Sequence, residues 1–197
     1  MRLFVAAEIP DAIRERARET AAALRDRFRR ARIGIDARWV DPANMHLTVR
    51  FIGHVPDDRA SLLIEALRGA VVAAPFDVHL AGCGAFPPKG APRVFWIGVR
   101  RGLDGLRGLH EEFNRRVAPF GYAPEDRPYS AHLTLARVKE IARADARRGR
   151  EIVEQLDVDL GSFTAMEATL FQSRLSPHGS TYQALARIPF SGSSRPA

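Results

Sequence analysis

The sequence predicts an α+β fold in which two similar lobes pack as one domain over residues 1–190, followed by a disordered tail over 191–197. Two observations lead to this prediction. The sequence HLTV at 46–49 returns as HLTL at 132–135, each time inside an apolar, strand-like run. No linker of disordered composition separates the two halves, so we expect the motif strands to face each other across a groove.

The first half of the chain alternates strands and helices. Arg2 to Ala7 is an apolar strand, and Pro10 with Asp11 suits the start of an amphipathic helix. A short strand over 37–40, a turn over 41–44 and the first motif strand, which ends at Gly53, come next. Asp57 or Asp58 caps the following helix, for which the pattern predicts a buried stripe of Leu62, Leu63, Ala66, Leu67 and Ala70.

The second half repeats this alternation and then ends in strands. Alternating residues over 76–86 and an apolar run over 94–99 predict two strands, and apolar spacing over 103–117 predicts a helix. A proline-marked loop over 121–128 leads into the second motif strand, which is expected over 129–137. The remaining elements are a helix over 141–156 and strands over 162–164, 165–175 and 182–188, the last after a turn over 177–179.

The composition, with 46% hydrophobic and 27% charged residues, is that of an ordinary globular protein. Cys83 is the single cysteine, which permits no internal disulfide and agrees with a reducing cytoplasm. No apolar run is long enough to span a bilayer, and the apolar run at the start of the sequence is too short for a secretory signal. We therefore expect a cytoplasmic monomer without membrane contact, and no protein partner is indicated.

The formal net charge of +7 favours a polyanionic partner such as RNA. Lys89 and Lys139 are the only lysines, however, and the many arginines accompany abundant alanine. That pattern fits a bias in genome composition as well as it fits selection for phosphate binding. The charge alone does not decide between the two.

The repeated motif places a histidine and a threonine on one strand face. Side chains alternate along a β-strand, so His46 shares a face with Thr48, and His132 shares one with Thr134. A neutral imidazole can take a proton from water, while a protonated one can give a proton to a leaving oxygen. Threonine hydroxyls can donate hydrogen bonds to phosphate oxygens. The pattern therefore suits acid–base chemistry on a phosphate, without deciding which histidine is the acid.

Other sites have less support in the sequence. There is no His-x-x-x-His, no cysteine pair and no carboxylate beside either motif histidine, so a metal site is poorly indicated. No glycine pattern for ATP or NAD occurs, so no cofactor is expected. A non-catalytic RNA-binding module remains the alternative, although binding alone requires neither an acid nor a base. Cys83 is interpreted as a small packed side chain.

The chain resembles the two-histidine phosphoesterase superfamily, and within it the RNA 2',3'-cyclic phosphodiesterases, also called 2'-5' RNA ligases. The resemblance covers nearly the whole sequence in order. Besides the two motifs, it rests on the segments 2–6, 9–10, 39–40, 44–49, 51–53, 84–87, 93–99, 132–137 and 172–173, and on Tyr182.

The resemblance implies two pseudo-symmetric lobes of antiparallel sheet with outer helices around a central cleft. It implies hydrolysis of an RNA 2',3'-cyclic phosphate to a 2'-phosphomonoester without metal or cofactor, and weak 2'-5' ligation in reverse. His46 would be the general acid and His132 the general base, while Thr48 and Thr134 would hold the phosphate. Arg137 would bind phosphate or nucleotide. A small cyclic nucleotide or a 2'-5' oligonucleotide stays open as the substrate.

Some positions fit this scheme less directly. The family often has a proline before the second motif, where this chain has Ser130 and Ala131. A regular strand would point Arg137 away from His132, so either the strand is irregular or Arg137 is structural. Arg50 would share the face of His46, or be solvated. Tyr129 and Phe51 are candidates for stacking on a base, with packing favoured for Phe51.

Overall fold

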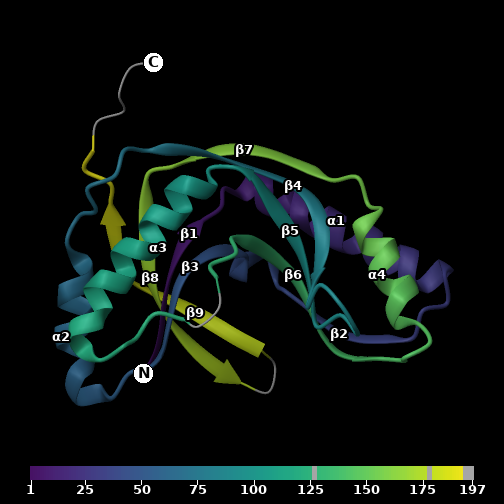
Figure 1. Ribbon diagram of the computed structural model, residues 1–197, viewed down its shortest axis with the longest axis horizontal. Helices are drawn as coiled ribbons and strands as arrows, with labels where there is room; N and C mark the ends of the chain where they lie inside the picture. Colours follow the sequence, from purple (N-terminus) through teal and green to yellow (C-terminus); the bar gives the residue numbers. More distant parts are fainter. Residues whose placement is uncertain (126–127, 177–178, 193–197) are drawn as a thin grey trace.

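A strongly curved antiparallel sheet organises the molecule, with helices on its outer side (Figure 1). The computed structural model describes residues 1–125, 128–176 and 179–192. Within these residues the elements, in chain order, are β1 (Arg2–Glu8), α1 (Asp11–Arg30), β2 (Ile35–Trp39), the 3-10 turn η1 (Pro42–Asn44), β3 (His46–His54), α2 (Asp57–Arg68), β4 (Phe76–Phe86), β5 (Val94–Arg101), α3 (Leu103–Val117), the 3-10 turn η2 (Ala118–Phe120), β6 (His132–Ile141), α4 (Ala146–Glu154), β7 (Asp159–Ala165), β8 (Glu167–Ser176) and β9 (Gly179–Pro189).

The described strands form one nine-stranded sheet. Eight of them follow the order β7-β4-β5-β6-β3-β1-β8-β9, and the ninth, β2, pairs with the C-terminal part of β6. The two halves of the sheet meet between the motif strands β3 and β6. Their register contains the single pair Leu47 and Leu133, and both side chains are fully buried. The predicted two-lobed arrangement is therefore one continuous sheet, joined where the two motifs lie side by side.

An approximate two-fold repeat relates the halves. Strand β1 pairs with β3 as β5 pairs with β6. A helix follows each of these two partners of the motif strands, α1 after β1 and α3 after β5. Each helix then crosses to the other half: α1 packs against β6, β7 and α4, while α3 packs against β3. Helix α1 buries one apolar stripe, consisting of Ile13, Ala17, Ala21, Leu24 and Phe28. This exchange ties the halves together through the core.

Most predicted elements are confirmed, and β4 and α3 have the expected bounds. Strand β6 continues to Ile141, because its last residues pair with β2, so α4 begins only at Ala146. Helix α2 is rotated relative to the prediction: it buries Ala60, Leu63 and Leu67, whereas Leu62 is 67% exposed.

The last described residues lie against the loop that follows α2. The backbone amides of Ser191 and Gly192 donate to the carbonyl oxygens of Val71 and Ala73, both at 2.9 Å, so these two residues of the predicted tail are held in place. The rest of that prediction, 193–197, and the predicted turn residues 177 and 178 lie outside the described residues.

Candidate active site

The two motif histidines occupy the same position in the two halves, as the first residue of β3 and of β6. Burial follows the expected alternation, because His46 and Thr48 are half-buried while Leu47 between them is fully buried. His132, Leu133 and Thr134 show the same pattern. The junction of the two half-sheets therefore brings both motifs together.

Each imidazole is oriented by the backbone two residues earlier. The Nδ1–H of His46 donates to the carbonyl oxygen of Asn44 at 2.8 Å, and that of His132 donates to the carbonyl oxygen of Ser130, also at 2.8 Å. This bond leaves Nε2 of each ring for chemistry. Nε2 of His46 lies 3.1 Å from the Oγ1 of Thr48, whose hydroxyl donates to the neutral ring.

Burial lowers the pKa of His46 from 6.5 to about 4. The Asn44 carbonyl opposes this shift, and the positive charges of Arg137 and His132 add to it. Burial also lowers the pKa of His132, against the Ser130 carbonyl and together with Arg137. Both rings are therefore neutral near pH 7 in the free protein, and a bound phosphate anion would favour their protonated forms.

Aromatic rings account for much of this burial. The ring of His46 stacks on Phe4, with centroids 4.8 Å apart, and meets the edge of Tyr182 at 5.3 Å. On the other side of the site, His132 meets Phe86 edge-on at 5.1 Å. These contacts cover one side of each imidazole.

A β-bulge in β6 explains the position of Arg137. Thr134 lies opposite Trp96 and Ala136 lies opposite Phe95, so Leu135 has no partner on β5. Two consecutive residues, Leu135 and Ala136, are consequently buried, and Arg137 returns to the face of Thr134. The sequence left two alternatives, an irregular strand or a structural role for Arg137. The irregular strand is correct, and Arg137 lines the cleft.

Strand β3 has the same bulge at the equivalent place, where Val49 has no partner on β1. It turns Arg50 away from His46 and brings Phe51, 39% exposed, to the cleft. The expectations for both residues are therefore wrong, since Arg50 is neither on the histidine face nor solvated and Phe51 is not packed inside. Arg50 is 3% exposed and donates to the carbonyl oxygens of Phe51 and Ala123 and to the carboxylate of Glu125.

Tyr129 supports the first motif from behind. Its hydroxyl donates to the carbonyl oxygen of Thr48 at 2.9 Å, and its ring stacks on His110 at 4.4 Å. His110 in turn donates from Nδ1 to the carbonyl oxygen of Val49 at 2.8 Å. Together with Arg50, these side chains satisfy the backbone carbonyls at the bulge of β3. Its hydroxyl and one face of its ring are thereby occupied, which favours packing over the predicted contact of Tyr129 with substrate.

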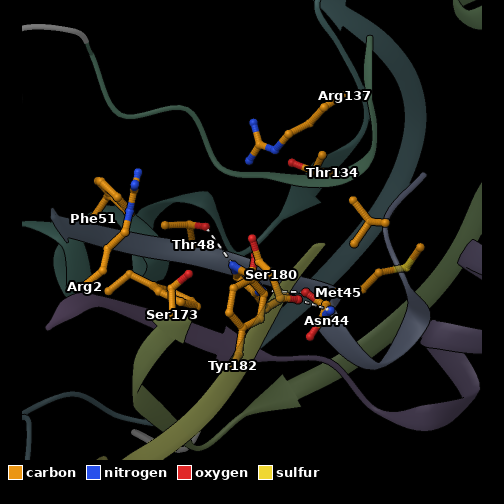
Figure 2. A pocket seen from close by; sticks show the side chains of 13 residues that line it. Arg2, Asn44, Met45, Thr48, Phe51, Thr134, Arg137, Ser173, Ser180 and Tyr182 are labelled. Carbon is orange, nitrogen blue, oxygen red and sulfur yellow. Dashed lines mark hydrogen bonds between the residues drawn. The ribbon is translucent and has the colours of Figure 1, made fainter. Parts of the chain in front are cut away.

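A cavity of about 480 Å³ lies over the motifs. Four of the predicted site residues, His46, Thr48, Thr134 and Arg137, line it; His132 and Tyr129 are not among its lining residues. Figure 2 shows Arg137 and Thr134 entering from β6, and Tyr182 and Ser180 from β9. The sequence did not assign a site role to several further lining residues: Arg2, Phe4, Val40, Asn44, Met45, Ser173, Ser180 and Tyr182.

Asn44 links two of these elements. Its side-chain amide donates to the carbonyl oxygen of Ser180 at 2.9 Å, and its own carbonyl holds His46. Strand β9 is thereby fixed beside the first motif. The segments that carry Asn44 and Tyr182 are part of the family resemblance, but no spacing in the sequence shows that β9 borders the cleft.

Among residues 1–125, 128–176 and 179–192, no three His, Cys, Asp or Glu side chains gather as a potential metal-ligand group. Burial raises the pKa of the Cys83 thiol to about 11, which agrees with a packed, unreactive side chain. None of the helices in the described part of the chain has the length and apolar character required to cross a membrane.

A curved sheet with two equivalent His-x-Thr strands at its centre defines a two-histidine phosphoesterase. Comparison with known proteins agrees. The family model described as "LigT like Phosphoesterase" matches residues 12–96 and again residues 97–182, so the chain belongs to the LigT-like phosphoesterase family. Each of the two successive matches contains one copy of the histidine and threonine motif.

Similar proteins cover nearly the whole chain. A protein of Aeropyrum pernix named RNA 2',3'-cyclic phosphodiesterase is 35% identical over 88% of this chain and 97% of its own. A protein of the same name from Thermotoga maritima is 31% identical over 98% of this chain and 97% of its own. A crystal structure of Escherichia coli LigT complexed with 3'-AMP superposes with a TM-score of 0.72 at 27% identity, covering 96% of this chain and 98% of the other.

A crystal structure of a Thermus thermophilus protein gives a TM-score of 0.75 at 28% identity, covering 98% of this chain and 99% of that one. These structures therefore share the overall fold of this chain over nearly its whole length.

Proposed function

We propose that the protein hydrolyses RNA 2',3'-cyclic phosphate ends to 2'-phosphomonoesters, with His46 and His132 as an acid–base pair and without a metal ion. The observation that carries the proposal is the equivalence of the two histidines, each oriented through Nδ1 so that Nε2 can exchange a proton. The names of the relatives from Aeropyrum pernix and Thermotoga maritima support the substrate.

In this mechanism, neutral His132 removes a proton from water as the water oxygen attacks phosphorus. The bond between phosphorus and the 3' oxygen breaks, and protonated His46 donates its Nε2 proton to that oxygen. The phosphate remains on the 2' oxygen. The negative charge of the bound phosphate raises the pKa of His46 above its low value in the free protein, which provides the proton that the acid requires.

The remaining cleft residues stabilise charge and orient the nucleotide. Hydroxyl groups of Thr48 and Thr134 donate to the non-bridging oxygens, and Arg137 adds a positive charge beside them. Phe51 offers an exposed ring for stacking of the terminal base, with the guanidinium of Arg2 lying 5.0 Å from its centroid.

The same acid and base can also serve another nucleophile. A 5' hydroxyl in place of water would attack the cyclic phosphate, lose its proton to His132 and form a 2'-5' phosphodiester bond as the 3' hydroxyl departs. We assign this ligation as a weak side reaction, because water is present at far higher concentration. We further propose that the protein acts as a cytoplasmic monomer on RNA ends and needs no protein partner.

The test is hydrolysis of a short RNA ending in 2',3'-cyclic phosphate, with EDTA present and the product isomer identified. The proposal predicts conversion to the 2'-phosphate at an unchanged rate in EDTA. Loss of the rate in EDTA would overturn the metal-free mechanism, and formation of a 3'-phosphate would overturn the assignment of the leaving oxygen. RNA binding without turnover would instead favour a binding module.

A further inference from the structure

A second hollow of about 280 Å³ adjoins the catalytic cavity. Five residues border both spaces: Val40, Asn44, Arg137, Ser180 and Tyr182. Arg137 therefore lies between the place proposed for the reacting phosphate and a separate space next to it. In Figure 2, Arg137 is well away from Arg2 and Phe51, which border another part of the catalytic cavity.

The charge in the second hollow is arranged for an anion. Arg38 on β2 is the register partner of Arg137 on β6, so both side chains lie on the same sheet face, and both line this space. Two arginines side by side offer a bound phosphate two charge-assisted hydrogen-bonding contacts. Asp41 also lines the hollow, and its carboxylate accepts a hydrogen bond from the amide of Ala43 at 2.9 Å.

The walls suit a nucleoside as well as a phosphate. Trp39 lines the hollow, and the guanidinium of Arg25 lies 4.7 Å from its ring, which holds the ring in position. Ser176, Ser180 and Thr181 supply hydroxyl groups. Aromatic rings beside arginines and hydroxyls are typical of sites for single-stranded RNA.

We propose that the second hollow binds the internucleotide phosphate and the nucleoside that precede the cyclic end, so that the preferred substrate is an RNA chain rather than a single nucleotide. This inference rests on the proposed function. A cavity of about 480 Å³ holds one nucleotide, and the chain leaves that nucleotide through its 5' oxygen, away from the reacting 2' and 3' oxygens. The second hollow adjoins this cavity, and both Arg38 and Arg137 line it.

The experiment compares a mononucleoside 2',3'-cyclic phosphate with a dinucleotide that ends in the same group. For the wild type we expect kcat/KM to be at least about tenfold higher for the dinucleotide, the size of one good ionic contact. Arg38→Gln should lower kcat/KM about tenfold more for the dinucleotide than for the mononucleotide. Arg38 is exposed, so the fold tolerates this change. Arg38→Lys keeps the charge without the planar guanidinium, so its kcat/KM for the dinucleotide should fall less than that of Arg38→Gln.

Salt dependence gives a second measurement. One additional phosphate contact should steepen the fall of log kcat/KM with log salt by about 0.7 for the dinucleotide, and Arg38→Gln should remove this difference. The matched control is Arg107→Gln on α3, an exposed arginine paired with Asp104 at 3.3 Å, which should behave as the wild type with both substrates.

Three outcomes would overturn the inference. Equal losses with both substrates in Arg38→Gln would mean that the hollow contacts the terminal nucleotide. No loss with either substrate would mean that Arg38 does not contact RNA. Equal kcat/KM for both substrates in the wild type would mean that no subsite exists beyond the catalytic cavity. If the wild type hydrolysed neither substrate, the proposed function itself would fail.

Discussion

Lowering the pH should destabilise the folded protein through His46. Its pKa is about 4 in the folded state because it is buried, against 6.5 for the free side chain. Between these two values the unfolded chain binds more protons than the folded one, so stability falls as the pH falls. From the two pKa values, the titration of His46 should lower the free energy of unfolding by about 2 kcal/mol at pH 5 relative to pH 7. The loss should reach about 3 kcal/mol once the pH is below 4.

The assay is urea unfolding at pH 7 and pH 5, for the wild type and for His46→Gln. Other groups also titrate over this range, so the informative quantity is the difference between the losses of the two proteins. Glutamine has no proton to gain, and the wild type should lose about 2 kcal/mol more than the variant. His132→Gln should change the loss in the same direction, because burial lowers the pKa of His132 too.

A direct titration of the imidazole by NMR provides the decisive comparison. The structure predicts that His46 in the free protein remains neutral down to about pH 4. A His46 resonance that titrates near pH 6.5, with equal losses of stability in wild type and His46→Gln, would refute the reasoning from burial. It would also remove the need for bound phosphate to protonate the acid.

Three further predictions concern the site. In pH profiles of the two kinetic constants, the fall of kcat at alkaline pH should occur at higher pH than the fall of kcat/KM, because bound phosphate raises the pKa of His46. If both constants fell at the same pH, this coupling between phosphate and His46 would be contradicted. Thr134→Val should lower the rate of the chemical step about 100-fold by removing a donor to the phosphate, measured by single-turnover hydrolysis, and a rate near the wild type would exclude that role. Tyr129→Phe should reduce the free energy of unfolding by about 1 kcal/mol through loss of the bond to the Thr48 carbonyl, with KM nearly unchanged; a large rise in KM would instead indicate substrate contact.

Much of the site could be predicted because it depends on local strand periodicity. A motif of histidine, leucine and threonine in an apolar run fixes which side chains share a face, and the structure shows that burial pattern in both copies. The repeat of the motif also indicated the two-fold arrangement. Helix α3 and strand β4 were found with their bounds because their apolar spacing is regular.

The bulges could not be predicted from periodicity, and they decide the orientation of three charged or aromatic side chains. An extra residue at Val49 exchanges the faces of Arg50 and Phe51, and an extra residue at Leu135 brings Arg137 to the cleft. Whether a strand accommodates such a residue depends on its neighbours, β1 and β5, which lie far away in the sequence. The role of Tyr129 likewise depends on a distant element, because its ring stacks on His110 of α3.

The length of β6 shows a similar limit. Residues after Lys139 have an alanine-rich and charged composition that favours a helix, but pairing with β2 extends the strand to Ile141. Tertiary pairing thus overrides local propensity there. The contribution of β9 to the cleft has the same origin, since Ser180 and Tyr182 reach the first motif only through the order of strands in the sheet. The single domain over residues 1–190 stays a prediction.

The central claim is that two equivalent histidines act as acid and base on one phosphate. It is tested most directly by the single-turnover rate of cyclic phosphate hydrolysis in His46→Ala and His132→Ala, measured beside the wild type with substrate at saturation. The paired mechanism predicts that each variant loses at least about 100-fold in rate while still binding the RNA. A rate near that of the wild type in either variant would contradict the paired mechanism.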